Sequence, residues 1–227
     1  MPEVMLKVKI YEYDSPCGKL YLAARKGSLC LCDWAASKNL TDTLTRLSKA
    51  LDIEFILPET ETVKPRAEKP SKVIVSAMKQ LGQFFNGRRK TFNIPYQMAG
   101  TPFQNAVWKS LLDIPYGKSV SYAEIAAMAG YPKAVRAAAN ACGDNALSVI
   151  IPCHRVIGSD DGLTGYGGGL GAKRYLLDLE SPQQRLPFKT VTKKPVKKTT
   201  TAKKPARKTA GKTVKKTPAK KTAAKKQ

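Results

Sequence analysis

The sequence contains a single histidine, His154, and this scarcity restricts the chemistry available to the chain. A zinc site takes about four nitrogen or sulfur ligands at suitable spacing, and only one imidazole is present to join Cys30 and Cys32 in such a set. The five cysteines are odd in number and lack the spacing of a disulfide framework. We therefore predict that the chain binds no metal and that its thiols stay reduced.

Acidic residues are missing from one end of the chain, and long apolar runs are missing throughout. No apolar segment follows Met1 and none is long enough to cross a bilayer, so we expect an intracellular protein with no membrane partner. Residues 181–227 carry 17 Lys or Arg and no acid, which leaves 23 basic and 17 acidic residues before them. We predict that residues 183–227 are a disordered basic tail, because Lys, Thr, Ala and Pro bury too little apolar surface to fold.

Hydrophobic periodicity divides the rest of the chain into two domains. Period-two patterns predict a three-stranded antiparallel meander over residues 4–10, 20–24 and 29–34. Helical spacing predicts helices over residues 40–51 and 74–85, with a strand over 53–57 between them. Residues 1–95 are thus expected to form a small α/β domain and residues 96–182 a mostly helical one, in an α+β fold.

Within the second domain the pattern predicts helices over residues 102–112, 122–130, 133–142 and 170–180. Ser121 and Glu124 form a capping box that begins the second of these helices. A tight turn containing Gly130 joins the second helix to the third, as in a helix-turn-helix with Lys133 and Arg136 available to DNA. A plain helical hairpin, with its alanines packed in the core, fits the same segment.

Residues 150–156, Ile-Ile-Pro-Cys-His-Arg-Val, are the stretch most suited to covalent chemistry. The apolar run before Pro152 predicts a buried strand that ends at the proline. A cysteine is nucleophilic as the thiolate, which a neighbouring imidazole or cation favours, and Arg155 adds positive charge beside Cys153. Adjacent side chains diverge, so a sharp turn or a bridging water must bring Cys153 and His154 together. A buried structural cysteine is the alternative.

A glycine-rich run over residues 165–171 precedes the last predicted helix. It lacks both the Gly-Lys-Ser/Thr ending of a P-loop and the βαβ setting of a dinucleotide site, which argues against a phosphate loop. Glycine also lets the backbone approach a ligand closely. Glu180, at the far end of the helix, could orient His154 and complete a Cys-His-Glu relay.

Several of these motifs occur together in one known family. They are Pro152-Cys153-His154-Arg155-Val156, Asn145 upstream of it, Ser121-Tyr122 and Arg136 in the helix pair, and Gly168-Gly169-Leu170 leading to Glu180. The set resembles the O6-alkylguanine-DNA alkyltransferases, also called methylated-DNA–protein-cysteine methyltransferases. The resemblance is strong over residues 102–180, looser over 4–95 and absent from the tail, which is similar to the C-terminal tail of linker histones.

The resemblance implies an activity and a set of roles. Such a protein binds the minor groove of double-stranded DNA, flips out an O6-alkylguanine and moves the alkyl group to its own cysteine in a single turnover, without a cofactor. O4-alkylthymine is implied as a further substrate. Cys153 looks like the acceptor, His154 the base acting through a water, and Glu180 its orienter. Tyr122 would lie against the flipped nucleotide and help protonate the leaving guanine, and Asn145 would hold the turn before the cysteine.

The resemblance also implies the DNA contacts and the substrate pocket. Arg136 would replace the flipped base in the stack, with Lys133, Ala137 and Ala138 beside it at the DNA. The pocket residues would be Val156, Tyr166, Gly167, Lys173 and Ser148. Some members carry a proline at the position of Ser148 and a serine at that of Gly167, which leaves the range of alkyl groups open. The N-terminal histidines of zinc-containing relatives and the cysteine-rich module of transcriptional regulators have no counterpart here.

Two other functions stay open from the sequence. A Cys-His-Glu hydrolase would use the same three residues but would turn over, and a non-catalytic reader of alkylated DNA would keep the helix pair without needing the cysteine. The resemblance favours a DNA-associated monomer in the nucleoid or cytoplasm of a prokaryote, or in a nucleus. The tail predicts either an electrostatic tether to DNA phosphates or a solubilising segment.

Overall fold

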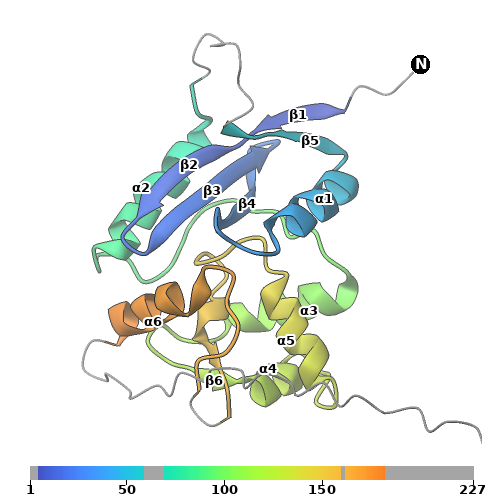
Figure 1. Cartoon of the computed structure of the whole chain (residues 1–227), viewed down its shortest axis with the longest axis vertical. Helices are drawn as coiled ribbons and strands as arrows, with labels where there is room; N and C mark the ends of the chain where they lie inside the picture. Colours follow the sequence, from blue (N-terminus) through green and yellow to red (C-terminus); the bar gives the residue numbers. More distant parts are fainter. Residues whose placement is uncertain (1–4, 59–68, 160–161, 182–227) are drawn as a thin grey trace, which may run out of the picture. The chain divides into compact units, whose positions relative to one another are not determined.

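An antiparallel sheet forms the centre of the N-terminal half in the computed structural model, which describes residues 5–58, 69–159 and 162–181 (Figure 1). Its strands are β2 (Tyr11–Ser15), β3 (Gly18–Arg25) and β4 (Ser28–Trp34), in that order. The described residues all fall within one compact unit, residues 1–192. The predicted tail lies outside the described residues.

The sequence pattern assigned the wrong first strand to this sheet. Residues 6–9 form β1 (Leu6–Lys9), which pairs in parallel with β5 (Ile53–Ile56) in a separate two-stranded sheet. The amide of Ile10 donates to the carbonyl of Ile56 (3.0 Å), and the chain enters the meander only after that residue. Strand β2, Tyr-Glu-Tyr-Asp-Ser, is half-buried and polar, so its alternation is weaker than that of β1 and was missed.

Two helices cover the two faces of the sheet. Helix α2 (Lys72–Phe85) packs against β2, β3 and β4, whereas α1 (Leu40–Leu51) packs against β4 and β5. The faces of β3 alternate as a strand requires, with Leu20 and Leu22 in the core cluster that includes α2, and Tyr21 in the cluster that includes α1. The predicted helices over 40–51 and 74–85 and the strand over 53–57 are therefore confirmed.

The C-terminal half is mostly helical, as predicted, with α3 (Pro102–Leu112), α4 (Tyr122–Met128), α5 (Val135–Gly143) and α6 (Gly169–Glu180). Strands β6 (Val120–Ser121) and β7 (Val156–Ile157) pair in parallel among them. The capping box at Ser121 and Glu124 is formed, and Gly130, at φ +86°, supplies the left-handed turn after α4. The mixed fold has an antiparallel sheet and six helices among its described residues.

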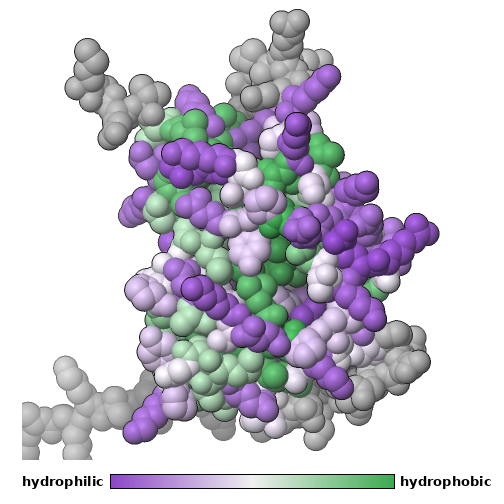
Figure 2. Space-filling view, turned by 180° about the vertical axis from the view of Figure 1, so that it is seen from behind, coloured by the Kyte–Doolittle hydropathy of each residue, from purple (hydrophilic) through white to green (hydrophobic). Residues whose placement is uncertain are grey.

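One hydrophobic cluster runs from the sheet into the helices and contains Leu22, Trp34, Val107, Ile125 and Ile151. Because both halves share this core, residues of β4 can contact the loops of the C-terminal half. The predicted domain boundary near residue 95 stays a prediction. Figure 2 shows one face of the molecule, on which hydrophilic side chains flank a narrow band of hydrophobic residues. None of the described helices combines the length and apolarity needed to cross a bilayer.

Candidate active site

The segment before Cys153 is a buried turn and not the strand that its apolar residues predicted. The amide of Ile151 donates to the carbonyl of Leu147 (2.8 Å), and Ser148 and Ile151 form an isolated bridge. Between them Val149 has φ +71°, a left-handed conformation that is strained for a β-branched residue. The turn redirects the chain so that Cys153 begins the 3-10 helix η2 (Cys153–Arg155).

Asn145 links this turn to the thiol. Its Nδ2 donates to the carbonyl of Ile151 (2.9 Å) and to Sγ of Cys153 (3.2 Å), and its Oδ1 accepts from the amide of Leu147 (3.0 Å). All these groups are buried. One side chain therefore satisfies the turn's backbone and places a donor on the sulfur, which favours the thiolate over the thiol.

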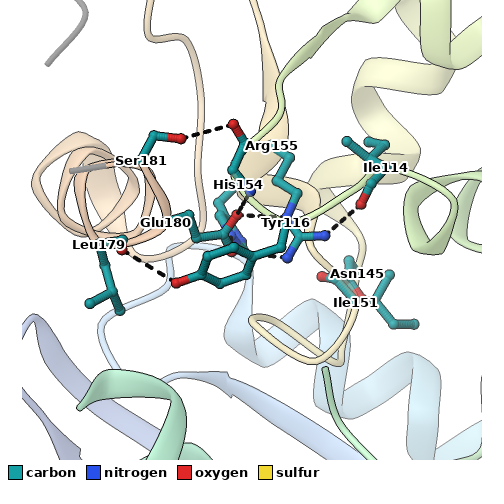
Figure 3. Close-up of polar contacts among 10 residues, drawn as sticks. Ile114, Tyr116, Asn145, Ile151, His154, Arg155, Leu179, Glu180 and Ser181 are labelled. Atoms are coloured by element: carbon teal, nitrogen blue, oxygen red, sulfur yellow. Dashed lines mark hydrogen bonds and ion pairs between the residues drawn. The ribbon is translucent and has the colours of Figure 1, made fainter. Parts of the chain in front are cut away.

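His154 and Glu180 meet inside the protein, with Nε2 of the imidazole 2.8 Å from Oε1 of the carboxylate (Figure 3). Burial lowers the pKa of His154, although the hydrogen bond that it donates to Glu180 opposes this, so the imidazole is neutral near pH 7. An ionised carboxylate can only accept, so Nε2 carries the proton and Nδ1 keeps its lone pair. Nδ1 is buried and has no hydrogen-bond partner among the described residues, and it is thus the basic atom of the ring.

The position of Arg155 in the sequence suggested that its charge activates the Cys153 thiol. In the structure the guanidinium is instead paired with Glu180. Its Nε and Nη2 donate to the two oxygens of Glu180 (2.8 and 3.0 Å), and its Nη1 donates to the carbonyl of Ile114 (2.6 Å). The amide of Gly117 adds a further bond to Oε2 of Glu180 (3.0 Å). Burial alone would raise the pKa of Glu180, but the bonds and charges of His154 and Arg155 lower it to about 2.

The resting thiol is protonated. Burial raises the pKa of Cys153 to about 11, the Asn145 hydrogen bond and Lys173 act against it, and the charge of Asp33 raises it further. Among the described residues, Asn145 is the one side chain that hydrogen-bonds to the sulfur, so His154 forms no direct hydrogen bond to it. The bridging water that the sequence required between Cys153 and His154 stays a prediction.

The predicted pocket residues gather near this site through backbone contacts. Lys173 is fully buried, and its Nζ donates to the carbonyls of Val156 (2.6 Å) and Thr164 (2.9 Å). Burial lowers the pKa of Lys173 to about 8. The same Nζ lies 5.9 Å from the centre of the Tyr122 ring, and Thr164 Oγ1 donates to the Tyr122 hydroxyl (3.4 Å). Lys173 therefore contacts β7, α4 and Thr164, the residue just before the glycine-rich run.

Tyr166 and Trp34 provide two buried polar atoms near the imidazole. The Tyr166 ring makes edge contacts with His154 and with Trp34, at centroid distances of 6.5 and 6.0 Å. The Tyr166 hydroxyl and the Trp34 indole N–H lie close together without the alignment of a hydrogen bond, and neither has another partner in the described ranges. Both polar atoms therefore lie buried close to the imidazole.

Sequence reasoning missed the part that β4 plays in the site. Ser148 Oγ donates to Oδ1 of Asp33 (3.0 Å), and a Cβ on Gly168 would lie 2.6 Å from the Trp34 ring. Gly167 is less constrained, since a Cβ there would lie 3.4 Å from Oγ of Ser37 and 3.6 Å from Oδ1 of Asp33. The available signal was a single acid, next to the last residue of an otherwise apolar run, Leu-Cys-Leu-Cys-Asp-Trp.

The predicted DNA-facing residues divide between the surface and the core. Arg136 and Ala137 are exposed in the first turn of α5, and Lys133 is exposed in the turn that precedes this helix. Ala138 is fully buried, so its side chain packs in the core, and a DNA contact at this residue stays a prediction. Helical geometry explains the split, because successive side chains point in different directions around α5.

Cys30 and Cys32 do not form the start of a metal site. They are buried in different core clusters on opposite faces of the sheet. Within residues 5–58, 69–159 and 162–181, no group of three or more His, Cys, Asp or Glu side chains is arranged to hold a metal ion. All five cysteines are free thiols.

Comparison with known proteins places these observations in a family. Residues 102–182 match the model of the 6-O-methylguanine DNA methyltransferase DNA-binding domain. The chain is 46% identical over 140 residues to the constitutive methylated-DNA–protein-cysteine methyltransferase of Bacillus subtilis, covering 61% of this chain and 84% of that protein. It is 46% identical over 168 residues to the corresponding protein of Mycolicibacterium paratuberculosis, covering 74% and 88%.

A solved structure is similar over most of its length. The crystal structure of Mycobacterium tuberculosis OGT in complex with DNA superposes with a TM-score of 0.61 at 36% identity, covering 78% of this chain and 94% of that one. The likeness therefore extends over both halves of the fold, including the N-terminal half that the matched family model leaves out.

Proposed function

We propose a reaction and a mode of DNA binding for this chain on the premise that it belongs to the methylated-DNA–protein-cysteine methyltransferase family. The chain is a DNA repair protein that transfers an alkyl group from O6 of guanine in DNA to one of its own cysteines. Our proposal is that Cys153 is the acceptor, and that O4 of alkylated thymine is a second donor. The observation that carries it is the His154–Glu180 contact, which leaves Nδ1 as a base on the residue that follows the Asn145-bound Cys153.

The transfer proceeds by direct displacement. The Cys153 proton passes through a water to Nδ1 of His154, and the thiolate attacks the alkyl carbon. The carbon–sulfur bond forms as the bond to guanine O6 breaks, and guanine leaves as a neutral base after taking a proton from the hydroxyl of Tyr122. Burial raises the pKa of Tyr122, so its hydroxyl is protonated and able to donate at the start. Imidazolium then returns the thiol proton to the tyrosine, which balances the reaction.

The reaction ends after one event because the product is a thioether. A carbon–sulfur single bond offers no leaving group that water could displace under these conditions, and the buried turn around Cys153 gives little access to another nucleophile. A hydrolase would instead form an ester-like intermediate and need oxyanion donors at the cysteine. Each molecule therefore repairs one lesion.

We assign DNA recognition to α4 and α5, on the proposal that they act as a helix-turn-helix; their packing against each other on either side of the Gly130 turn supports this. The exposed side chains of Lys133 and Arg136 and the small Ala137 allow close approach to the minor groove. Arg136 fills the gap left by the flipped base, while Lys133 contacts phosphate. Flipping costs a few kcal/mol, so a residue that fills the gap lowers the cost of reaching the pocket.

Arg136→Ala is expected to slow repair of O6-methylguanine in duplex DNA by about tenfold to hundredfold, the equivalent of a few kcal/mol. The rate with the free base O6-benzylguanine should stay within about twofold, because no base has to be extruded from a stack. Single-turnover rates on both substrates measure the difference.

Lys133→Ala is the matched control, since it removes an exposed cation of the same segment. It should weaken duplex binding at all sequences and leave the single-turnover rate at saturating DNA unchanged. Equal losses on duplex and free base for Arg136→Ala would show that this residue serves the pocket or the fold and not flipping.

The domains divide these tasks. Residues 96–182 carry the acceptor and the DNA-binding helices, and residues 1–95 support them. The lysine-rich residues 183–227 bind DNA phosphates without regard to sequence. The partner of all three is double-stranded DNA, and the protein works where the chromosome lies, in a nucleoid or a nucleus.

Truncation after Phe188 tests the role of the tail. The rate with free O6-benzylguanine should not change, because every residue assigned to catalysis precedes residue 188. Affinity for undamaged duplex should fall. If half of the tail's cations engage DNA, the slope of log affinity against log salt should become less steep by several units, at about 0.9 per phosphate neutralised. A salt titration of both forms measures this, and superimposable slopes would leave the tail with a solubilising role alone.

A further inference from the structure

The C-terminal end of β4 contacts both loops that enclose the acceptor cysteine. The amide of Cys32 donates to the carbonyl of Ala146 (2.8 Å), and Cys32 forms a bridge with Leu147 at the start of the active-site turn. On the other side, the Trp34 ring packs against the backbone of Gly168 so closely that a Cβ there would lie 2.6 Å from it. Between these two residues lies Asp33.

Asp33 is a buried acid without an ion pair. It is 4% exposed, and within the described part of the chain its carboxylate forms no salt bridge. Its Oδ1 accepts from the amide of Trp34 (2.9 Å) and from Oγ of Ser148 (3.0 Å). Burying a carboxyl group is costly unless its bonds serve a purpose, and buried acids of this kind are concentrated at functional sites.

We propose that Asp33 is a positioning residue for alkyl transfer, which anchors the active-site turn through Ser148 and so fixes the place from which Cys153 attacks. The inference rests on the proposed acceptor role of Cys153. Ser148 lies within the turn, next to the strained Val149, and its bond to β4 is a side-chain tie between the turn and the rigid sheet. A strained backbone conformation such as that of Val149 persists when the surrounding contacts hold it, and this hydrogen bond is one such contact.

The charge of Asp33 has a second effect on the acceptor. Burial raises the pKa of Asp33 to about 6, with the Trp34 amide, Ser148 and Arg46 acting against it, so the group is ionised above that pH. The charge raises the pKa of the Cys153 thiol, whereas Lys173 from α6 and the Asn145 bond lower it. The other titratable groups facing the thiol are Cys142, Tyr122 and Tyr166, which are neutral at pH 7.

Anchoring and charge can be separated by three variants. Asp33→Asn keeps an oxygen that accepts from Ser148 and from the Trp34 amide but removes the charge. Asp33→Ala removes both the acceptor and the charge. Ser148→Ala keeps the charge and removes the donor. Asp14→Asn, at an exposed position on β2, controls for the loss of one negative charge elsewhere.

The experiment measures single-turnover methyl transfer from O6-methylguanine duplex and, separately, alkylation of Cys153 by iodoacetamide at about pH 8, mapped by peptide mass. Transfer should slow about tenfold in Asp33→Ala and in Ser148→Ala, and stay within about threefold of the unmodified protein in Asp33→Asn. Alkylation by iodoacetamide should become faster in both Asp33 variants, because removing the Asp33 charge lowers the pKa of the Cys153 thiol. It should not become faster in Ser148→Ala, which keeps that charge.

Two results would overturn the inference. One is transfer at the unmodified rate in both Asp33→Ala and Ser148→Ala, and the other is an Asp33→Asn rate as low as that of Asp33→Ala. Melting temperatures identify a variant that fails to fold. If Asp33→Ala is such a variant, the transfer rates of Asp33→Asn and Ser148→Ala alone test the inference. Failure of the proposed function has a different signature, because the unmodified protein itself would carry no methyl group on Cys153.

Discussion

Replacing Glu180 by glutamine should slow alkyl transfer at least about hundredfold and destabilise the fold by about 3–5 kcal/mol. The carboxylate accepts bonds from His154, from two nitrogens of Arg155 and from the amide of Gly117. A glutamine has one accepting oxygen, and its NH2 group would face the N–H donors of these partners. It also carries no charge, so the buried Arg155 guanidinium loses its counter-charge. It also removes the constraint that places the proton on Nε2 of His154 and leaves Nδ1 basic.

Single-turnover kinetics and chemical denaturation measure these two losses. Glu124→Gln is the control, because Glu124 is an exposed acid whose bonds are confined to its own helix cap. That change should cost under about 1 kcal/mol and leave the transfer rate unchanged. If Glu180→Gln transferred methyl at nearly the unmodified rate, the proposed orientation of His154 would be wrong.

The same carboxylate gives the protein a defined sensitivity to acid. Burial opposes ionisation of Glu180, but His154 and Arg155 lower its pKa to about 2, below the usual value of 4.5. A depressed pKa contributes stability that is full above the unfolded value and is lost as the pH falls toward the folded value. The contribution of Glu180 should thus disappear between about pH 4.5 and pH 2 and be absent from Glu180→Gln across that range.

Cys153→Ser should abolish methyl transfer and leave affinity for duplex DNA within about threefold. An alkoxide is far harder to form than a thiolate near neutral pH, so the nucleophile is lost outright. The side chain is buried behind the turn, and Asn145 can donate to a hydroxyl oxygen as it does to the sulfur, so the DNA-binding surface stays in place. Gel-shift titration and transfer of labelled methyl from duplex DNA measure the two properties.

Cys142→Ser is the matched control for this change. Cys142 is also buried, it lies on α5, and burial raises the pKa of its thiol beyond that of Cys153. Its replacement should therefore preserve transfer of one methyl group. Residual methylation of Cys153→Ser would show that another side chain can accept the alkyl group and would contradict the proposed acceptor.

Local signals in the sequence predicted most of the elements. The helices and strands with regular apolar spacing were placed within a few residues, and the capping box at Ser121 gave the start of α4. The first strand of the meander was wrong because the stronger alternation belongs to β1, whose partner β5 lies far along the chain. Pairing of that kind depends on contacts that no local window contains.

The active-site segment shows the same limit. Its burial was predictable from Val149, Ile150 and Ile151, but its turn is held by Asn145 and by Asp33, whose bond to Ser148 spans 115 positions. Proximity in sequence suggested that the charge of Arg155 favours the Cys153 thiolate, whereas in the structure Arg155 forms an ion pair with Glu180. The adjacency of Cys153 and His154 suggested that these two residues act together, and only the tertiary structure identifies Nδ1 as the basic atom of the imidazole.

The central claim is that Cys153 accepts one alkyl group from DNA and is not regenerated. The most direct test is the intact mass of the full chain before and after incubation with excess duplex containing O6-methylguanine, followed by peptide mapping. The account predicts a gain of one methyl group per molecule, located on Cys153, and no further repair after one equivalent. Methyl on a different residue, an unchanged protein mass with repaired DNA, or repair beyond one equivalent would contradict it.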